Sequence, residues 1–180
     1  QVFHAIGKTQ GLFPMPFGHN IYLFLDLYAL SEVAVKKSVT DAKLLNQKLK
    51  VQKLVVKITR PTNVAIMEYL KKELEDIPNL VLKIDYKNIG FKKILQADAK
   101  KFDIGMMILS YELFSFKDAM EELLNLRIPI FKVGFNAIGE TKETFVLLND
   151  IKSYEQISPL IFDISSQLKT KTKVFDLDPI

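Results

Sequence analysis

The side chains of this sequence that could bind a ligand lie at the ends of two apolar runs. Asp26 closes the run IYLFLDL at 21–27, and Ser110, Tyr111 and Glu112 follow the run DIGMMILS at 103–110. An acid at the end of a strand either contacts a ligand or caps the helix that follows. The three polar residues form either a ligand-sensing loop or the plain start of a helix. The sequence leaves both pairs of alternatives open.

Other chemistries have little support. The chain has no cysteine, which excludes disulfides, thiol catalysis and cysteine-ligated metal. His4 and His19 are the two histidines, and neither has a partner at metal-ligand spacing. Asp176 and Asp178 alternate with apolar residues, as the end of a strand requires, and two such acids are weak evidence for Mg²⁺. Without a P-loop, a dinucleotide fingerprint or a nucleophile elbow, we expect no enzyme and no bound cofactor.

Five apolar runs, each followed by a helix-like segment, must position these side chains. Runs that are apolar on both faces are typical of parallel strands buried between helix layers. We therefore predict an α/β fold with a doubly wound, mostly parallel five-stranded sheet in the order 3-2-1-4-5. The topological switch point then lies between strands one and four, where Asp26 faces the 110–115 loop. The runs are 21–27, 54–60, 80–86, 103–110 and 128–134.

Two helix starts can be placed from the sequence. Ser31 is a suitable N-cap for a helix over 31–49. Pro61 and Thr62 are expected to open the helix after strand two, which Pro78 ends.

The predicted α/β domain covers residues 19–134, and a different segment lies on each side of it. Residues 1–18 alternate glycine and proline with apolar side chains, which predicts an irregular arm that packs on this domain or on a neighbouring subunit. Residues 135–180 form a partial repeat of strand, helix and strand. Its run TFVLLND at 144–150 parallels IYLFLDL, and KVFDLDP at 173–179 parallels KLVVKITRP at 53–61.

The charge balance has two interpretations. The net charge is +4 and the sequence pI is about 9.1, which is compatible with a nucleic-acid or anionic membrane surface. The lysines are scattered, however, and no aromatic-and-basic motif accompanies them, so we expect ordinary solvated faces and no nucleic-acid partner. No run reaches the ~18–20 apolar residues that span a bilayer, and no signal peptide is apparent, so we expect a cytoplasmic chain.

The pattern resembles the universal stress protein family of adenine-nucleotide-binding α/β folds. The likeness covers residues 19–134, with a second, partial copy at 143–179. It rests on the opening strand that ends in Asp26, the step from strand to proline at Arg60-Pro61, and the segment from Ala97 into DIGMMILS and IPIFKVG. The resemblance implies that Asp26 holds an adenine or a ribose.

ATP-binding members of that family carry a G-x2-G-x9-G-[S/T] motif after strand four. This chain has Ser110 and Leu113 at the first two glycine positions. The likeness is therefore to the family's non-ATP-binding branch, which implies a non-catalytic regulatory or stress-response module with at most a weak nucleotide or nucleoside ligand. Tandem copies also occur as cytoplasmic tails of cation–proton antiporters, which would place a membrane domain upstream. A nucleotidyl- or phosphoryl-transfer enzyme of the same broad fold is a further alternative.

A homodimer is the expected assembly. Strand five should lie at a sheet edge, and a long apolar edge favours pairing with another chain unless it is covered. The partial repeat adds apolar side chains at Ile161, Phe162, Ile164 and Leu168. The alternative is a compact monomer in which the second copy folds back over strand five.

Overall fold

The structure, a computed structural model, describes residues 18–49, 51–87, 90–115, 128–134, 143–148 and 171–176, with residues 158, 161, 162, 165, 166 and 169. Four expectations therefore lie wholly or mostly outside the described residues. They are the arm at 1–17, the helix after strand four, the connector at 135–142 and the helix of the second copy.

Five strands form one parallel sheet in the order β3-β2-β1-β4-β5. This order confirms the predicted fold, and it places β5 at an edge. The strands are β1 (Asn20–Asp26), β2 (Lys53–Thr59), β3 (Leu80–Asp85), β4 (Ile104–Ser110) and β5 (Ile130–Val133).

The core is centred on β1 and β4. Residues 21–25 of β1 are all 0% exposed, and every residue of β4 is buried. Both strands are covered on two faces, which is why their sequences are apolar without alternation.

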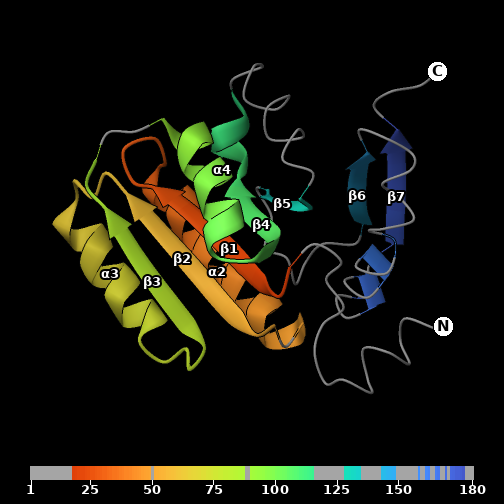
Figure 1. Ribbon diagram of the computed structural model, residues 1–180, viewed down its shortest axis with the longest axis horizontal. Helices are drawn as coiled ribbons and strands as arrows, with labels where there is room; N and C mark the ends of the chain where they lie inside the picture. Colours follow the sequence, from red (N-terminus) through yellow and green to blue (C-terminus); the bar gives the residue numbers. More distant parts are fainter. Residues whose placement is uncertain are drawn as a thin grey trace.

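Helices cover both faces of the sheet. α2 (Glu32–Leu49) lies behind the sheet in Figure 1, and α4 (Phe91–Lys101) passes in front of it. α3 (Val64–Leu74) lies beside α2, because the Lys43 Nζ of α2 is 3.1 Å from the Glu73 Oε2 of α3. The rings of Phe24 in β1 and Phe91 in α4 pack with centroids 6.4 Å apart. Among the described residues, no helix is both long and apolar enough to cross a membrane.

The two expected helix starts have different outcomes. The Ser31 hydroxyl oxygen accepts a hydrogen bond from the Ala34 N–H at 3.2 Å, which confirms Ser31 as the N-cap of α2. The expectation for α3 was wrong by three residues, because the helix begins at Val64 and not at Pro61. The N-cap is Asn63, whose Oδ1 accepts from the Ile66 N–H at 3.2 Å, and Pro61 lies before the helix. An asparagine side chain satisfies a first-turn N–H, which proline at the first position does not do.

The segment expected to be a partial second copy contains a separate two-stranded sheet. β6 (Glu143–Leu148) and β7 (Lys171–Asp176) pair in parallel, as β1 and β2 do. In the described sheets neither strand pairs with β5.

Gly18 permits a close backbone contact where β1 begins. A Cβ at this position would lie 2.5 Å from the Asp103 carbonyl oxygen and 2.6 Å from the Ile104 carbonyl carbon. Because both neighbours are backbone atoms, we expect Gly18→Ala to lower the free energy of unfolding by about 2 kcal/mol. Urea unfolding would measure this change. Gly134→Ala is the control, because nothing lies within 4 Å of the point where its Cβ would be. Equal stability of the two variants would contradict the clash.

Candidate functional site at the carboxyl edge of the sheet

The carboxyl ends of β1, β2 and β3 bring together a row of polar side chains. The strand register aligns Asp26 with Thr59, and Thr59 with Asp85. Aligned residues of parallel strands point to the same face, so these three side chains share the face that α4 covers. Ligands of such sheets bind at this edge.

Asp26 is buried in an ion pair that was not predicted from the sequence. Asp26 as a whole residue is 4% exposed. Oδ1 accepts from the Arg60 Nε at 2.9 Å and from the Tyr28 N–H at 3.1 Å, and Oδ2 accepts from the Arg60 Nη2. The carboxylate therefore binds a guanidinium fork rather than the first turn of α2, where Ser31 is the cap. The hydrogen bond to Asp26 raises the pKa of Arg60 above its usual value, because it stabilises the charged form.

Arg60 links three strand ends. Its N–H donates to the Asp85 carbonyl oxygen at 3.2 Å, while its side chain crosses to Asp26 at the end of β1. Its φ is 48°, in the left-handed region that non-glycine residues rarely adopt. Such strained residues cluster at ligand sites and switches, which marks this position as a candidate functional residue.

The loop after β4 forms the 3-10 helix η1 (Tyr111–Ser115). Ser110 is fully buried, and its hydroxyl oxygen accepts from the Glu112 N–H at 3.3 Å. Tyr111 is half-buried. The side chain of Leu113 is buried. Of the three predicted loop residues, Glu112 makes the contact that matters most for ligand binding, because it reaches the N-terminus of α2.

Glu112 binds the N-terminus of α2. Its Oε2 accepts from the Ser31 N–H at 2.8 Å, and its Oε1 accepts from the Ser31 hydroxyl at 2.6 Å. These donors lie at the switch point between β1 and β4, where a helix N-terminus would attract an anionic ligand. In this chain a side-chain carboxylate already occupies them.

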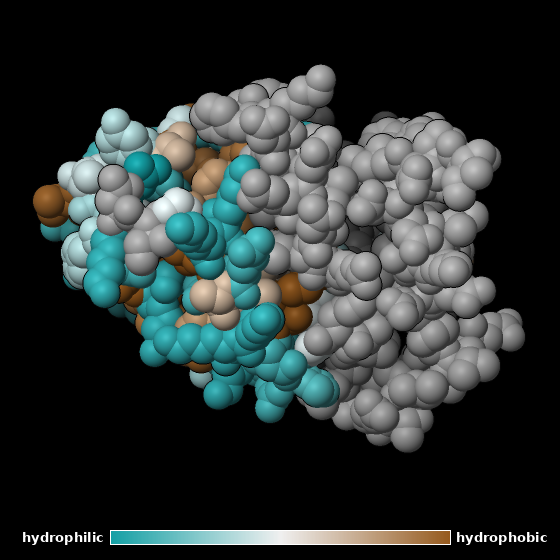
Figure 2. Space-filling view, turned by 45° about the horizontal axis from the view of Figure 1, so that its top comes forward, coloured by the Kyte–Doolittle hydropathy of each residue, from teal (hydrophilic) through white to brown (hydrophobic). Residues whose placement is uncertain are grey.

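A shallow hollow of about 480 Å³ opens beside the Asp26–Arg60 pair, on the β2 and β3 side of the switch point. We call it the tyrosine recess; its lining residues are Tyr28, Arg60, Pro61, Thr62 and Tyr86. In Figure 2 pale residues of intermediate hydropathy gather at the upper left, where the carboxyl edge of the sheet comes forward. No group of three or more histidines or acids able to hold a metal occurs in the part of the chain that the structure describes.

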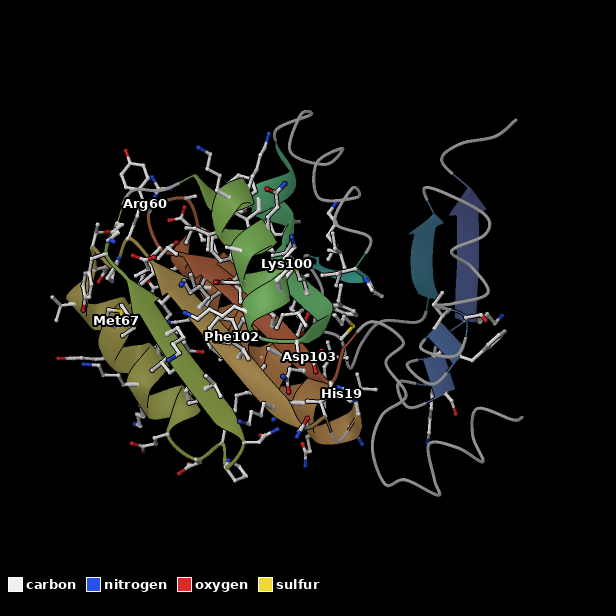
Figure 3. All side chains as sticks on the ribbon, viewed as in Figure 1. His19, Arg60, Met67, Lys100, Phe102 and Asp103 are labelled. Carbon is white, nitrogen blue, oxygen red and sulfur yellow. The ribbon has the colours of Figure 1, made fainter. Side chains whose placement is uncertain are left out.

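His19 and Asp103 lie at the opposite, amino end of the sheet (Figure 3). The His19 Nδ1 is 2.7 Å from the Asp103 Oδ2, so this surface histidine has a carboxylate partner that its sequence position did not reveal.

The fold and the site define an α/β chain with a doubly wound parallel sheet and a polar carboxyl edge. The chain matches neither any known family model nor any curated protein with which it was compared. The likeness to universal stress proteins therefore stays a prediction from the sequence pattern.

Proposed function

We propose that this chain is a non-catalytic regulatory binding module that binds a nucleoside-like ligand weakly at the carboxyl edge of its sheet and does not grip phosphate. The resemblance to the non-ATP-binding branch of the universal stress proteins supports this function. The observation that carries it is the contact of Glu112 with both donors of Ser31. A nucleotide phosphate at the switch point would have to displace a tethered carboxylate and would be repelled by its charge.

Asp26 is the residue proposed to contact the ligand. A carboxylate accepts about four hydrogen bonds. Its contacts with Arg60 and the Tyr28 N–H account for two bonds on Oδ1 and one on Oδ2. A ribose hydroxyl or an exocyclic amine would supply the fourth donor.

We expect Asp26→Asn to weaken the binding of adenosine about ten-fold, as the loss of one charge-assisted hydrogen bond does. A thermal-shift panel of nucleosides would identify the ligand, and calorimetry would give the two affinities. Asp103→Asn is the matched control, because this acid lies at the other end of the sheet. Unchanged affinity in folded Asp26→Asn would move the site elsewhere, and no binding of any nucleoside would refute the proposed ligand.

A further inference from the structure

Two tyrosine rings that line the tyrosine recess are highly exposed to solvent. Tyr28 is 71% exposed and Tyr86 is 75% exposed, whereas Tyr22 is completely buried. The two exposed rings line one hollow together with Pro61. Large side chains that lie exposed together commonly mark a binding surface.

The recess is aromatic without being strongly charged. The Arg60 guanidinium lies over the Tyr28 ring, with 4.5 Å between its central carbon and the ring centroid. Its charge is offset by the bidentate contact with Asp26. Grooves lined by aromatic rings and proline bind extended, proline-containing segments, because such segments lose little conformational freedom on docking.

This chain carries such a segment. Residues 12–17 read LFPMPF, with Pro14 and Pro16 separated by one residue. Each proline fixes its own φ and restricts the residue before it to extended backbone. Phe13 and Phe17 flank the prolines and add aromatic surface to the segment.

The two prolines of this segment are too close to Gly18 along the chain to reach the recess of their own molecule. Gly18 lies against Asp103 and Ile104 at the amino end of the sheet, and Figure 3 shows Arg60 and Asp103 at opposite ends. The seven residues of β1 separate the two ends by roughly 20 Å at about 3.3 Å per residue. Pro14 is four positions before Gly18, a reach of at most ~14 Å for a fully extended chain.

We propose that residues 12–17 of one copy bind in the tyrosine recess of a second copy. The distance along the sheet excludes the two prolines from the recess of their own molecule, and the aromatic lining fits them. A two-fold exchange docks both segments at once and gives a closed dimer. The tyrosine recess lies beside the switch point and binds a peptide segment rather than a nucleoside, so this inference goes beyond the proposed function.

A labelled peptide of residues 11–18 (GLFPMPFG), titrated with the full chain, tests this docking by fluorescence anisotropy. We expect saturable binding that weakens at least ten-fold for the peptide with both prolines replaced by alanine. The Tyr28→Ala/Tyr86→Ala double variant should weaken binding by a similar factor. Both rings are exposed, so their truncation leaves the core intact, and Val33→Ala, at a 61% exposed residue, is the control.

Sedimentation of the full chain gives the second measurement. Pro14→Ala/Pro16→Ala and Tyr28→Ala/Tyr86→Ala should each shift the mass toward the monomer, whereas Val33→Ala should not. Peptide binding that is absent, or that the tyrosine variant leaves unchanged, would overturn the proposal.

Discussion

Replacing Arg60 by alanine is expected to lower the free energy of unfolding by about 3 kcal/mol, the cost of leaving a buried charge without its partner. The Asp26 side chain is 5% exposed, and it would lose both guanidinium donors and keep the Tyr28 N–H. The Arg60 side chain is 29% exposed, so the loss of its own packing contributes little to the expected change in the free energy of unfolding. Urea unfolding followed by circular dichroism would measure the difference.

Arg60→Lys is the informative companion variant. It keeps the positive charge but cannot donate two parallel hydrogen bonds, so its stability should lie between those of the wild type and Arg60→Ala. If the free energy of unfolding of Arg60→Ala lies within about 0.5 kcal/mol of the wild-type value, as for ordinary surface substitutions, the Asp26–Arg60 pair does not hold the strand ends together.

Replacing Tyr22 by phenylalanine is expected to cost about 2 kcal/mol at neutral pH, the contribution of a hydrogen bond to a charged group. The buried Tyr22 hydroxyl donates to the Asp98 Oδ2 at 2.5 Å, and the Lys57 Nζ lies 3.6 Å from the same oxygen. This contact joins β1 to α4 beneath the carboxyl edge, so the variant should also loosen α4. Tyr86→Phe, on an exposed ring, is the control.

The same residue gives a distinct pH dependence. Burial first, and then the hydrogen bond to Asp98, raises the pKa of Tyr22 well above its ordinary value. The unfolded chain loses this proton above pH ~10 while the folded chain retains it, so the stability is fully present below that pH and falls above it. The loss is about 1.4 kcal/mol per pH unit, and Tyr22→Phe should remove it. Equal alkaline slopes for the wild type and the variant would contradict the assignment.

The sheet order was predictable because its cause lies in the sequence. Apolar runs such as IYLFLDL, without alternation, require cover on both faces, and helices between successive runs require parallel strands. Asp26 could be placed at the carboxyl edge for the same reason.

The contacts of the site could not be predicted in the same way. Arg60 reaches Asp26 across 34 residues of chain, and Glu112 reaches Ser31 across 81. Such pairs depend on loop conformations and rotamers that no periodicity encodes. A signal for the first pair exists, since an arginine directly after one buried strand and an acid at the end of another must meet at the same edge. The exposed ring of Tyr86 carries no comparable signal, because it follows its strand as any loop residue does.

The contact between Glu112 and Ser31 is central to the proposed function, since it assigns the phosphate position to a carboxylate of the chain itself. Calorimetric titrations of the full chain with adenosine and with ATP, under the same conditions, test it most directly. We predict that ATP binds no more tightly than adenosine, because Glu112 occupies both donors of Ser31 and its negative charge repels phosphate. ATP binding ten-fold or more tighter than adenosine, a gain of about 1.4 kcal/mol from the phosphates, would contradict it.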